Sequence, residues 1–196
     1  MTRALLHNFS GRTAIVLHRS EEVGQRIRAR CDRLGICTVV CLGDLDSSLA
    51  ATADMLILDI DTADDGMLPW PRGEAPMPVI GLIGSESPGR LAWALDQETD
   101  AYLPLSSLGN LFSALVIGHE IYARKSDRRT HEAETARRKK GRLDVIRAVL
   151  LLMGEGRDEA LALKKLRTMA MVAQLPLEDA ARLLLEAHPT ARDASG

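Results

Sequence analysis

Four short apolar runs in the first half of the chain constrain its fold more than any other feature. They occupy residues 13–18, 36–41, 55–60 and 78–84, and Val or Ile occurs in each of them. Runs that are apolar at nearly every position are typical of strands covered on both faces, as in a parallel sheet. We therefore predict that the four segments are neighbouring strands of one buried sheet.

The segments between the runs predict the connections. Residues 21–34 repeat apolar side chains at helical spacing, and Gly35 follows where a helix C-cap would lie. Residues 61–78 hold four prolines and two glycines, which indicates a loop with at most a short helical turn. A helix at 88–98 and a fifth strand at 101–103 continue the alternation. This order predicts an α/β fold, a doubly wound five-stranded parallel sheet over 12–122.

A stripe of apolar side chains at helical spacing follows the last predicted strand. Two interpretations stay open for it: the inner face of the last helix of the α/β domain, or a seam through which two copies form a homodimer. The stripe consists of Leu108, Leu111, Leu115 and Tyr122.

The chain then becomes basic and polar on every face. Residues 124–142 carry 9 Lys and Arg against 3 Asp and Glu, whereas residues 1–123 carry 9 against 16. A long helix that is solvated in its middle, and paired as a coiled coil with a partner helix, explains the pattern over 123–142. A linker broken at Gly141 explains it as well.

Helical spacing returns over 143–188 and predicts a small three-helix domain. Asp158 is a plausible N-cap for the second helix, and Pro176 lies at the start of the third. The apolar positions expected to face the interior are Leu143, Ile146, Leu150, Met153, Ala162, Leu166, Met169, Ala170, Ala173, Leu177, Ala180, Ala181, Leu184 and Leu185.

Composition excludes several classes of function. Aromatic residues make up 3% of the chain, too few for platforms on which single-stranded bases stack. Cys31, Cys37 and Cys41 form no C-x-x-C pair, so we expect reduced core thiols and neither a zinc site nor a disulfide framework. The N-terminus lacks the apolar core of a secretory signal, and no run approaches the ~20 apolar residues that span a bilayer. We expect a cytoplasmic protein without metal or cofactor.

The third apolar run ends on Asp59, and this acid carries the first resemblance. An acid at the end of the third strand resembles the phosphoacceptor of receiver domains in bacterial response regulators. The resemblance places the receiver's acidic pair at about His18 and Arg19, its hydroxyl at Ile83 and its lysine at Leu105. These residues supply none of the cation ligands or phosphoryl contacts that the reaction needs. We therefore expect a degenerate receiver, a pseudo-receiver that works without phosphorylation.

The last 50 residues carry a second resemblance. The segments 147–153, 158–171 and 175–185 resemble the ANTAR domain, a three-helix RNA-binding module, although Val149 replaces the lysine usual in that family. Nearly the whole chain is similar to ANTAR-domain antitermination regulators of the amidase-operon type. The resemblance implies a non-enzymatic homodimer that binds hairpins of a nascent leader transcript. Together with the charge pattern it predicts RNA contacts at Arg137, Arg138, Lys139, Lys140, Arg142, Arg147, Lys164, Lys165 and Arg167.

Two other functions stay open. The chain is a protein-interaction module if the ANTAR-like domain has lost RNA binding, and a phospho-switched response regulator if Asp59 is phosphorylated after all. If phosphorylation is disabled, control comes from a bound protein. The resemblance implies a ligand-sensing partner of the periplasmic-binding type.

Overall fold

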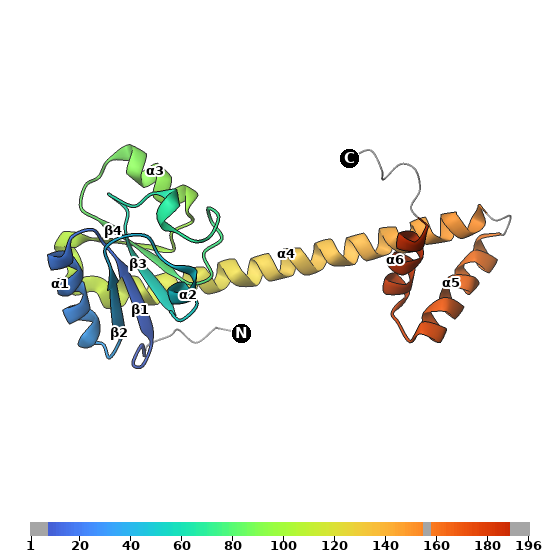
Figure 1. Cartoon of the computed structure of the whole chain (residues 1–196), viewed down its shortest axis with the longest axis horizontal. Coiled ribbons are helices and arrows are strands. Elements are labelled where there is room, and N and C mark those ends of the chain that lie inside the picture. The colour runs from blue at the N-terminus through green and yellow to red at the C-terminus, as the bar shows by residue number, and fades with distance from the viewer. Residues whose placement is uncertain (1–7, 155–157, 189–196) are drawn as a thin grey trace. The chain divides into compact units, whose positions relative to one another are not determined.

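A computed structural model describes residues 8–154 and 158–188 of the chain (Figure 1). The chain divides into two compact units, Met1–Ser126 (unit 1) and Asp127–Gly196 (unit 2). In the described part of the chain, no helix has both the length and the apolar character needed to cross a membrane. The finer boundaries predicted at 122 and 142 stay predictions.

Unit 1 is built on a five-stranded sheet in which every neighbouring pair is parallel. The strand order β2-β1-β3-β4-β5 is one of the two common doubly wound orders, and it confirms the predicted fold class. In this order the carboxyl ends of β1, β3 and β4 lie side by side. The strands are β1 Thr13–Leu17, β2 Cys37–Cys41, β3 Met55–Asp59, β4 Val79–Ile83 and β5 Ala101–Pro104.

Local signals start the helices between the strands. The Ser20 hydroxyl accepts the N–H of Val23 at the start of α1, Asp46 caps α2, and Pro88 opens α3 with its preset φ. The predicted loop at 61–78 contains one short helical turn, as expected. The elements are α1 Glu21–Asp32, α2 Ser47–Ala50, the 3-10 turn η1 Asp65–Met67, α3 Pro88–Asp96 and the 3-10 segment η2 Leu105–Asn110.

Two apolar clusters cover the two faces of the sheet. One packs α1 and the start of α4 against it, and the other packs α2 and the loop after β3. The central strand β3 is buried along its whole length, as predicted. The prediction that 36–41 is covered on both faces was wrong, because β2 lies at the sheet edge and leaves Cys37 and Val39 exposed.

Helix α4, Leu111–Met153, begins in unit 1 and ends in unit 2 without interruption. The predicted break at Gly141 is therefore absent, and the continuous helix is confirmed. Arg137, Arg138, Lys139 and Lys140 precede the glycine and favour helix, so its cost of about 1 kcal/mol does not end the helix.

Unit 2 packs the end of α4 against α5 Glu159–Ala173 and α6 Leu177–Ala187. The Asp158 side chain accepts the N–H of Leu161, which confirms the predicted N-cap. On α4, however, Ala148 and Leu152 are the buried core residues, and Met153 of the predicted stripe packs against them. The predicted inward stripe is wrong there, because Leu143, Ile146 and Leu150 are 53%, 56% and 60% exposed.

Burial of one histidine in unit 1 predicts how stability depends on pH. The ring centroids of His119 and Phe9 are 5.0 Å apart. Burial lowers the pKa of His119 below its ordinary value of 6.5. Below that value the unfolded chain therefore binds more protons than the folded one, so the free energy of unfolding falls as pH falls. We expect His119→Gln to flatten this dependence between pH 7.5 and 5.5 in urea unfolding. An unchanged slope would contradict the assignment.

Candidate nucleic-acid interface and pseudo-receiver site

Asp59 lies at the carboxyl end of β3, between the ends of β1 and β4. Its side chain is 5% exposed. The Thr62 hydroxyl donates to Asp59 Oδ2 at 2.5 Å, and the N–H of Asp61 donates to Oδ1 at 3.1 Å. The carboxyl group therefore caps the turn that follows β3, and it is closed off from solvent.

The sequence resemblance sets a receiver's acidic pair against the two residues after β1, His18 and Arg19. His18 Nδ1 accepts the N–H of Ser20 at 2.9 Å, so Nε2 carries a proton and lies 3.7 Å from Asp59 Oδ2. The guanidinium of Arg19 lies 3.8 Å from the Asp64 carboxylate. An imidazole and a guanidinium supply none of the oxygen ligands that a hard divalent cation prefers. This agrees with the degenerate site that the sequence predicts.

The same resemblance sets the receiver's hydroxyl and lysine against Ile83 and Leu105. Ile83 ends β4, and the nearby Ser85 hydroxyl donates to Asp61 Oδ1 at 3.0 Å. The N–H groups of Gly84 and Ser85 donate to Asp61 Oδ2 at 2.7 and 2.9 Å. Leu105 packs against the apolar cluster of unit 1. The loop after β4 is thus held by Asp61, and Leu105 brings no cation toward Asp59.

We expect acetyl phosphate with Mg²⁺ to leave the chain unmodified. Asp59 is buried, and the residues in the receiver's other positions cannot neutralise a transferring phosphoryl group. Within residues 8–154 and 158–188, no three His, Cys, Asp or Glu side chains are grouped to hold a metal ion. The measurement is the intact mass of the wild type and of Asp59→Asn after incubation. A phosphoryl adduct found in the wild type alone would restore the phospho-switched function.

The three cysteines have three different environments. Cys31 is buried in α1, Cys41 is half-buried and Cys37 is exposed. Burial raises the pKa of the Cys31 and Cys41 thiols, which makes both poor nucleophiles near neutral pH. The expectation that all three lie in the core fails at Cys37, because β2 is an edge strand.

The predicted dimer stripe faces the interior of unit 1. Leu111 and Leu115 are fully buried, and Leu108 packs against the same cluster. The Tyr122 hydroxyl donates to the carbonyl of Pro76 at 2.6 Å. Of the two interpretations, the geometry favours the inner face of a domain helix, because Leu111 and Leu115 present no surface to a second copy.

The predicted RNA contacts lie in unit 2, and the structure leaves most of them accessible. All are exposed except Lys165, which is half-buried. Arg138 lies 3.8 Å from Glu134, but within the described residues no ion pair engages Arg137, Lys139 or Lys140. Four contiguous cations are therefore displayed on α4 at 137–140, and three of them are uncompensated.

The upstream part of the basic segment contributes less than its composition indicates. Lys125 is buried, and its ammonium lies 2.6 Å from Asp100 Oδ1. Arg124 is paired with Glu120 on the same helix at 2.9 Å. Two of the cations counted in 124–142 thus belong to the architecture of unit 1, which concentrates the free basic surface further along α4.

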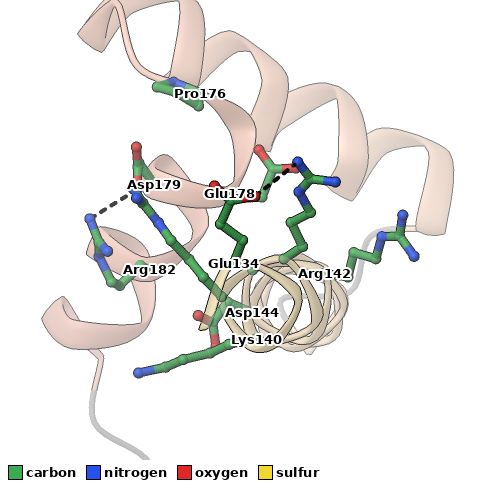
Figure 2. Close-up of a pocket in the computed structure, with 11 residues that line it drawn as sticks. Glu134, Lys140, Arg142, Asp144, Pro176, Glu178, Asp179 and Arg182 are labelled. Carbon is green, nitrogen blue, oxygen red and sulfur yellow. Dashed lines mark hydrogen bonds and ion pairs between the residues drawn. The ribbon is translucent and has the colours of Figure 1, made fainter. Parts of the chain in front are cut away.

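A groove of about 600 Å³ lies between α4 and the start of α6 in unit 2 (Figure 2). The sequence predicts four of its cations as RNA contacts, Arg137, Arg138, Lys140 and Arg142, whereas Lys139, Arg147 and the α5 cations lie outside its lining. Sequence reasoning missed the rest of the lining. Those residues are Glu134, Gly141, Asp144, Pro176, Glu178, Asp179 and Arg182.

Gly141 lets the two helices of the groove approach each other. A Cβ atom at this position would lie 3.0 Å from Cγ of Glu178 in the first turn of α6. Contacts that short are tighter than nine in ten real ones, so with a side chain at 141 Glu178 would have to shift by a few tenths of an ångström. The glycine expected to break the helix instead lies where α6 approaches α4 closely.

No family model matches this chain, and no curated protein matches it. Among solved structures, it is similar to ShkA Rec1 in complex with c-di-GMP, at 18% identity over 55% of this chain and 93% of that one (TM-score 0.43). It is also similar to the response regulator ChrA of a heme-sensing two-component system, at 15% identity over 93% of this chain and 98% of that one (TM-score 0.43). It is similar as well to the RcsB response regulator of Salmonella typhimurium, at 16% identity over 93% of this chain and 100% of that one (TM-score 0.42). Likenesses this distant say nothing about what this chain binds.

Proposed function

We propose that this chain is a non-enzymatic transcription antitermination regulator. Unit 2 binds hairpins of a nascent leader transcript as an ANTAR-type RNA-binding domain, and unit 1 is a pseudo-receiver. The observation that carries the proposal is the exposed basic run at 137–140, which lies on α4 directly before the three-helix core of unit 2. Contiguous Lys and Arg residues neutralise several phosphates at once, and this supplies most of the affinity for RNA.

The pattern of the three-helix unit gives further support. The buried positions Ala148, Leu152, Ala162, Leu166 and Ala181 fall within the segments that resemble the ANTAR domain. A small unit of this kind presents cations on a rigid helix, which suits recognition of a hairpin by its backbone and loop bases. Bound RNA would be held in the hairpin that lets polymerase read on.

Filter binding to the leader RNA of the operon that encodes the chain tests this proposal. We expect binding in 50 mM salt that weakens steeply toward 200 mM, because each neutralised phosphate adds about 0.7 to 0.9 to the slope of log affinity against log salt. The absence of binding at 50 mM salt would refute the proposal. It would favour the protein-interaction module that the sequence leaves open.

Control by a partner protein follows from the altered site around Asp59. His18 and Arg19 stand in place of an acidic pair. Switching by phosphorylation therefore lacks the carboxylates that would hold the divalent cation. Unit 1 instead offers exposed apolar side chains on α4, since Phe112, Ile117 and Ile121 are 37%, 53% and 44% exposed. A ligand-sensing protein of the periplasmic-binding type that covers this surface would sequester the regulator in the cytoplasm.

Homodimerisation is part of the proposal, through residues other than those of the first apolar stripe. Leu143, Ile146 and Leu150 are more than half exposed, and their spacing of three and four is that of a coiled-coil seam. The same stripe on two copies would bury these side chains against one another.

We expect Leu150→Lys to raise the dissociation constant of the homodimer by about 100-fold or more, because burying one leucine from each copy contributes about 2 kcal/mol apiece. Sedimentation equilibrium measures it. Leu161→Lys is the matched control, since Leu161 is also about half exposed but lies on α5. If both variants associate as the wild type does, the seam is not at Leu150.

A further inference from the structure

Four carboxylates line the α4–α6 groove, and Asp144 is the one of them that is buried. It is 8% exposed and lines the groove. Among the described residues no hydrogen bond or ion pair engages its carboxyl group. Among the described residues, the Asp144 oxygens are not counted with the fully enclosed polar atoms that lack a hydrogen-bond partner, so they are accessible from the groove. A ligand that enters the groove can therefore donate hydrogen bonds to Asp144.

The groove continues the buried face of α4. Arg137, Gly141, Asp144 and Ala148 follow one another at helical spacing, so the stripe that packs the core at Ala148 becomes charged where α6 begins. Lys140 precedes Asp144 by one helical turn. Figure 2 shows both side chains on the side of α4 where Asp179 and Arg182 of α6 lie. The groove thus pairs an acceptor for N–H groups with cations about one turn away.

This pairing defines the chemistry of the ligand. The carboxyl group of Asp144 accepts hydrogen bonds, and two donors side by side match its two oxygens best. Arg137 and Lys140 are exposed, and no carboxylate in the described residues engages them, so they can bind an anion with several oxygens, such as a phosphate. A volume of about 600 Å³ lies within the range of sites for small ligands and exceeds what a phosphate alone would fill.

Guanine is the RNA base that satisfies these conditions. Its Watson–Crick edge places N1–H beside the 2-amino group, two donors in the same direction. Adenine and cytosine each place one amino donor beside a ring-nitrogen acceptor, and uracil places its N3–H between two carbonyl oxygens. Only guanine therefore meets a carboxylate with two donors and no repelling acceptor.

We propose that the α4–α6 groove binds a guanosine 5′-phosphate unit, with the base on Asp144 and the phosphate on Arg137 and Lys140. Gly141 supports the site by letting α6 lie close enough to form the opposite wall. Two sources share this chemistry: a guanosine in single-stranded RNA, and a free guanine nucleotide. The site stands apart from the general RNA affinity of the basic run, because Asp144 repels phosphate.

Fluorescence anisotropy with the full chain tests the site. The probes are a labelled U12 oligomer, the same oligomer with one central guanosine, adenosine, cytidine or inosine, and free GMP or AMP as competitors. We expect the guanosine oligomer to bind about 10-fold more tightly than the adenosine, cytidine or all-uridine oligomers. Inosine, which lacks the 2-amino group, should lose most of that preference. Competition by GMP at equal or lower concentration than the oligomer would identify the free nucleotide as the preferred source.

Asp144→Asn, which keeps the size of the side chain, should bring guanosine and adenosine oligomers within about twofold of each other while U12 binding persists. Glu132→Gln is the matched control, because it removes one exposed carboxylate from α4 outside the groove and should keep the preference. Equal binding of all substituted oligomers by the wild type, without GMP competition, would overturn this inference alone. Binding to no oligomer would overturn the proposed RNA-binding function, and the site as well unless GMP itself binds. The inosine comparison uses the wild type, so it decides the question even if Asp144→Asn fails to fold.

Discussion

Replacement of Arg137, Arg138, Lys139 and Lys140 by alanine is expected to weaken RNA binding by about 10²- to 10³-fold at 0.1 M salt, because four phosphate contacts are lost. The slope of log affinity against log salt should fall by about 3 in the same variant. Both effects follow from the exposure of the four side chains on α4. Anisotropy or filter binding across a salt series measures them together.

A matched pair of double variants separates a specific surface from a change in net charge. Lys139→Ala with Lys140→Ala removes two cations from the basic run, and Arg26→Ala with Arg28→Ala removes two exposed cations from α1. The first pair should lower the salt slope by about 1.5 and the second should leave it unchanged. Equal losses in the two pairs would mean that RNA affinity comes from overall charge and not from α4.

Lys125→Met is expected to destabilise unit 1 by about 3 to 5 kcal/mol, the usual cost of removing one partner from a buried ion pair. The Lys125 ammonium lies 2.6 Å from Asp100 Oδ1 and donates to the carbonyl of Glu98 at 2.8 Å. Asp100 Oδ2 in turn accepts the N–H of Val79 at the start of β4. The lysine therefore ties α4 to the amino ends of β4 and β5, and its loss leaves a buried carboxylate without its cation.

Urea unfolding followed by tryptophan fluorescence measures this effect in unit 1, because Trp70 and Trp93 both lie there. Arg124→Met is the control, since it removes the same charge from the neighbouring, largely exposed position and should cost under about 1 kcal/mol. A free energy of unfolding within 1 kcal/mol of the wild type for Lys125→Met would show that the pair contributes little.

The strands were predictable because a strand buried on two faces is apolar at nearly every position, and this run can be recognised without knowing which strands pair with it. All five lie within a few residues of their expected places. The exposure of β2 was not predictable in the same way, because strand order decides which strand lies at the edge. Helix α2 was missed, since four residues, Ser47–Ala50, are too few to show a helical period.

The apolar stripes on α4 show where periodicity stops being informative. Leu143, Ile146 and Leu150 have the spacing of a buried face, and so do Ala148 and Leu152. Only the packing of α5 and α6 decides that the second set is buried. The large apolar side chains predicted the wrong face as buried, whereas the small Ala148 lies where the helices pack closely.

The two candidate sites also differ in how far the sequence alone predicts them. Asp59 lies at the end of β3, where the third apolar run predicts the strand to end. The groove in unit 2 depends on α6 lying against Gly141, a contact between residues 37 positions apart, Gly141 and Glu178. In the sequence, the only sign of Asp144 was an acid one turn after Lys140 and one turn before Ala148.

Single-round transcription through the leader and terminator of the operon that encodes this chain tests the central claim most directly. We predict that the wild type and Asp59→Asn raise read-through equally, and that the variant with alanine at 137–140 does not raise it. Read-through that is unaffected by the wild type, or that depends on Asp59, would contradict an RNA-binding regulator that works without phosphorylation.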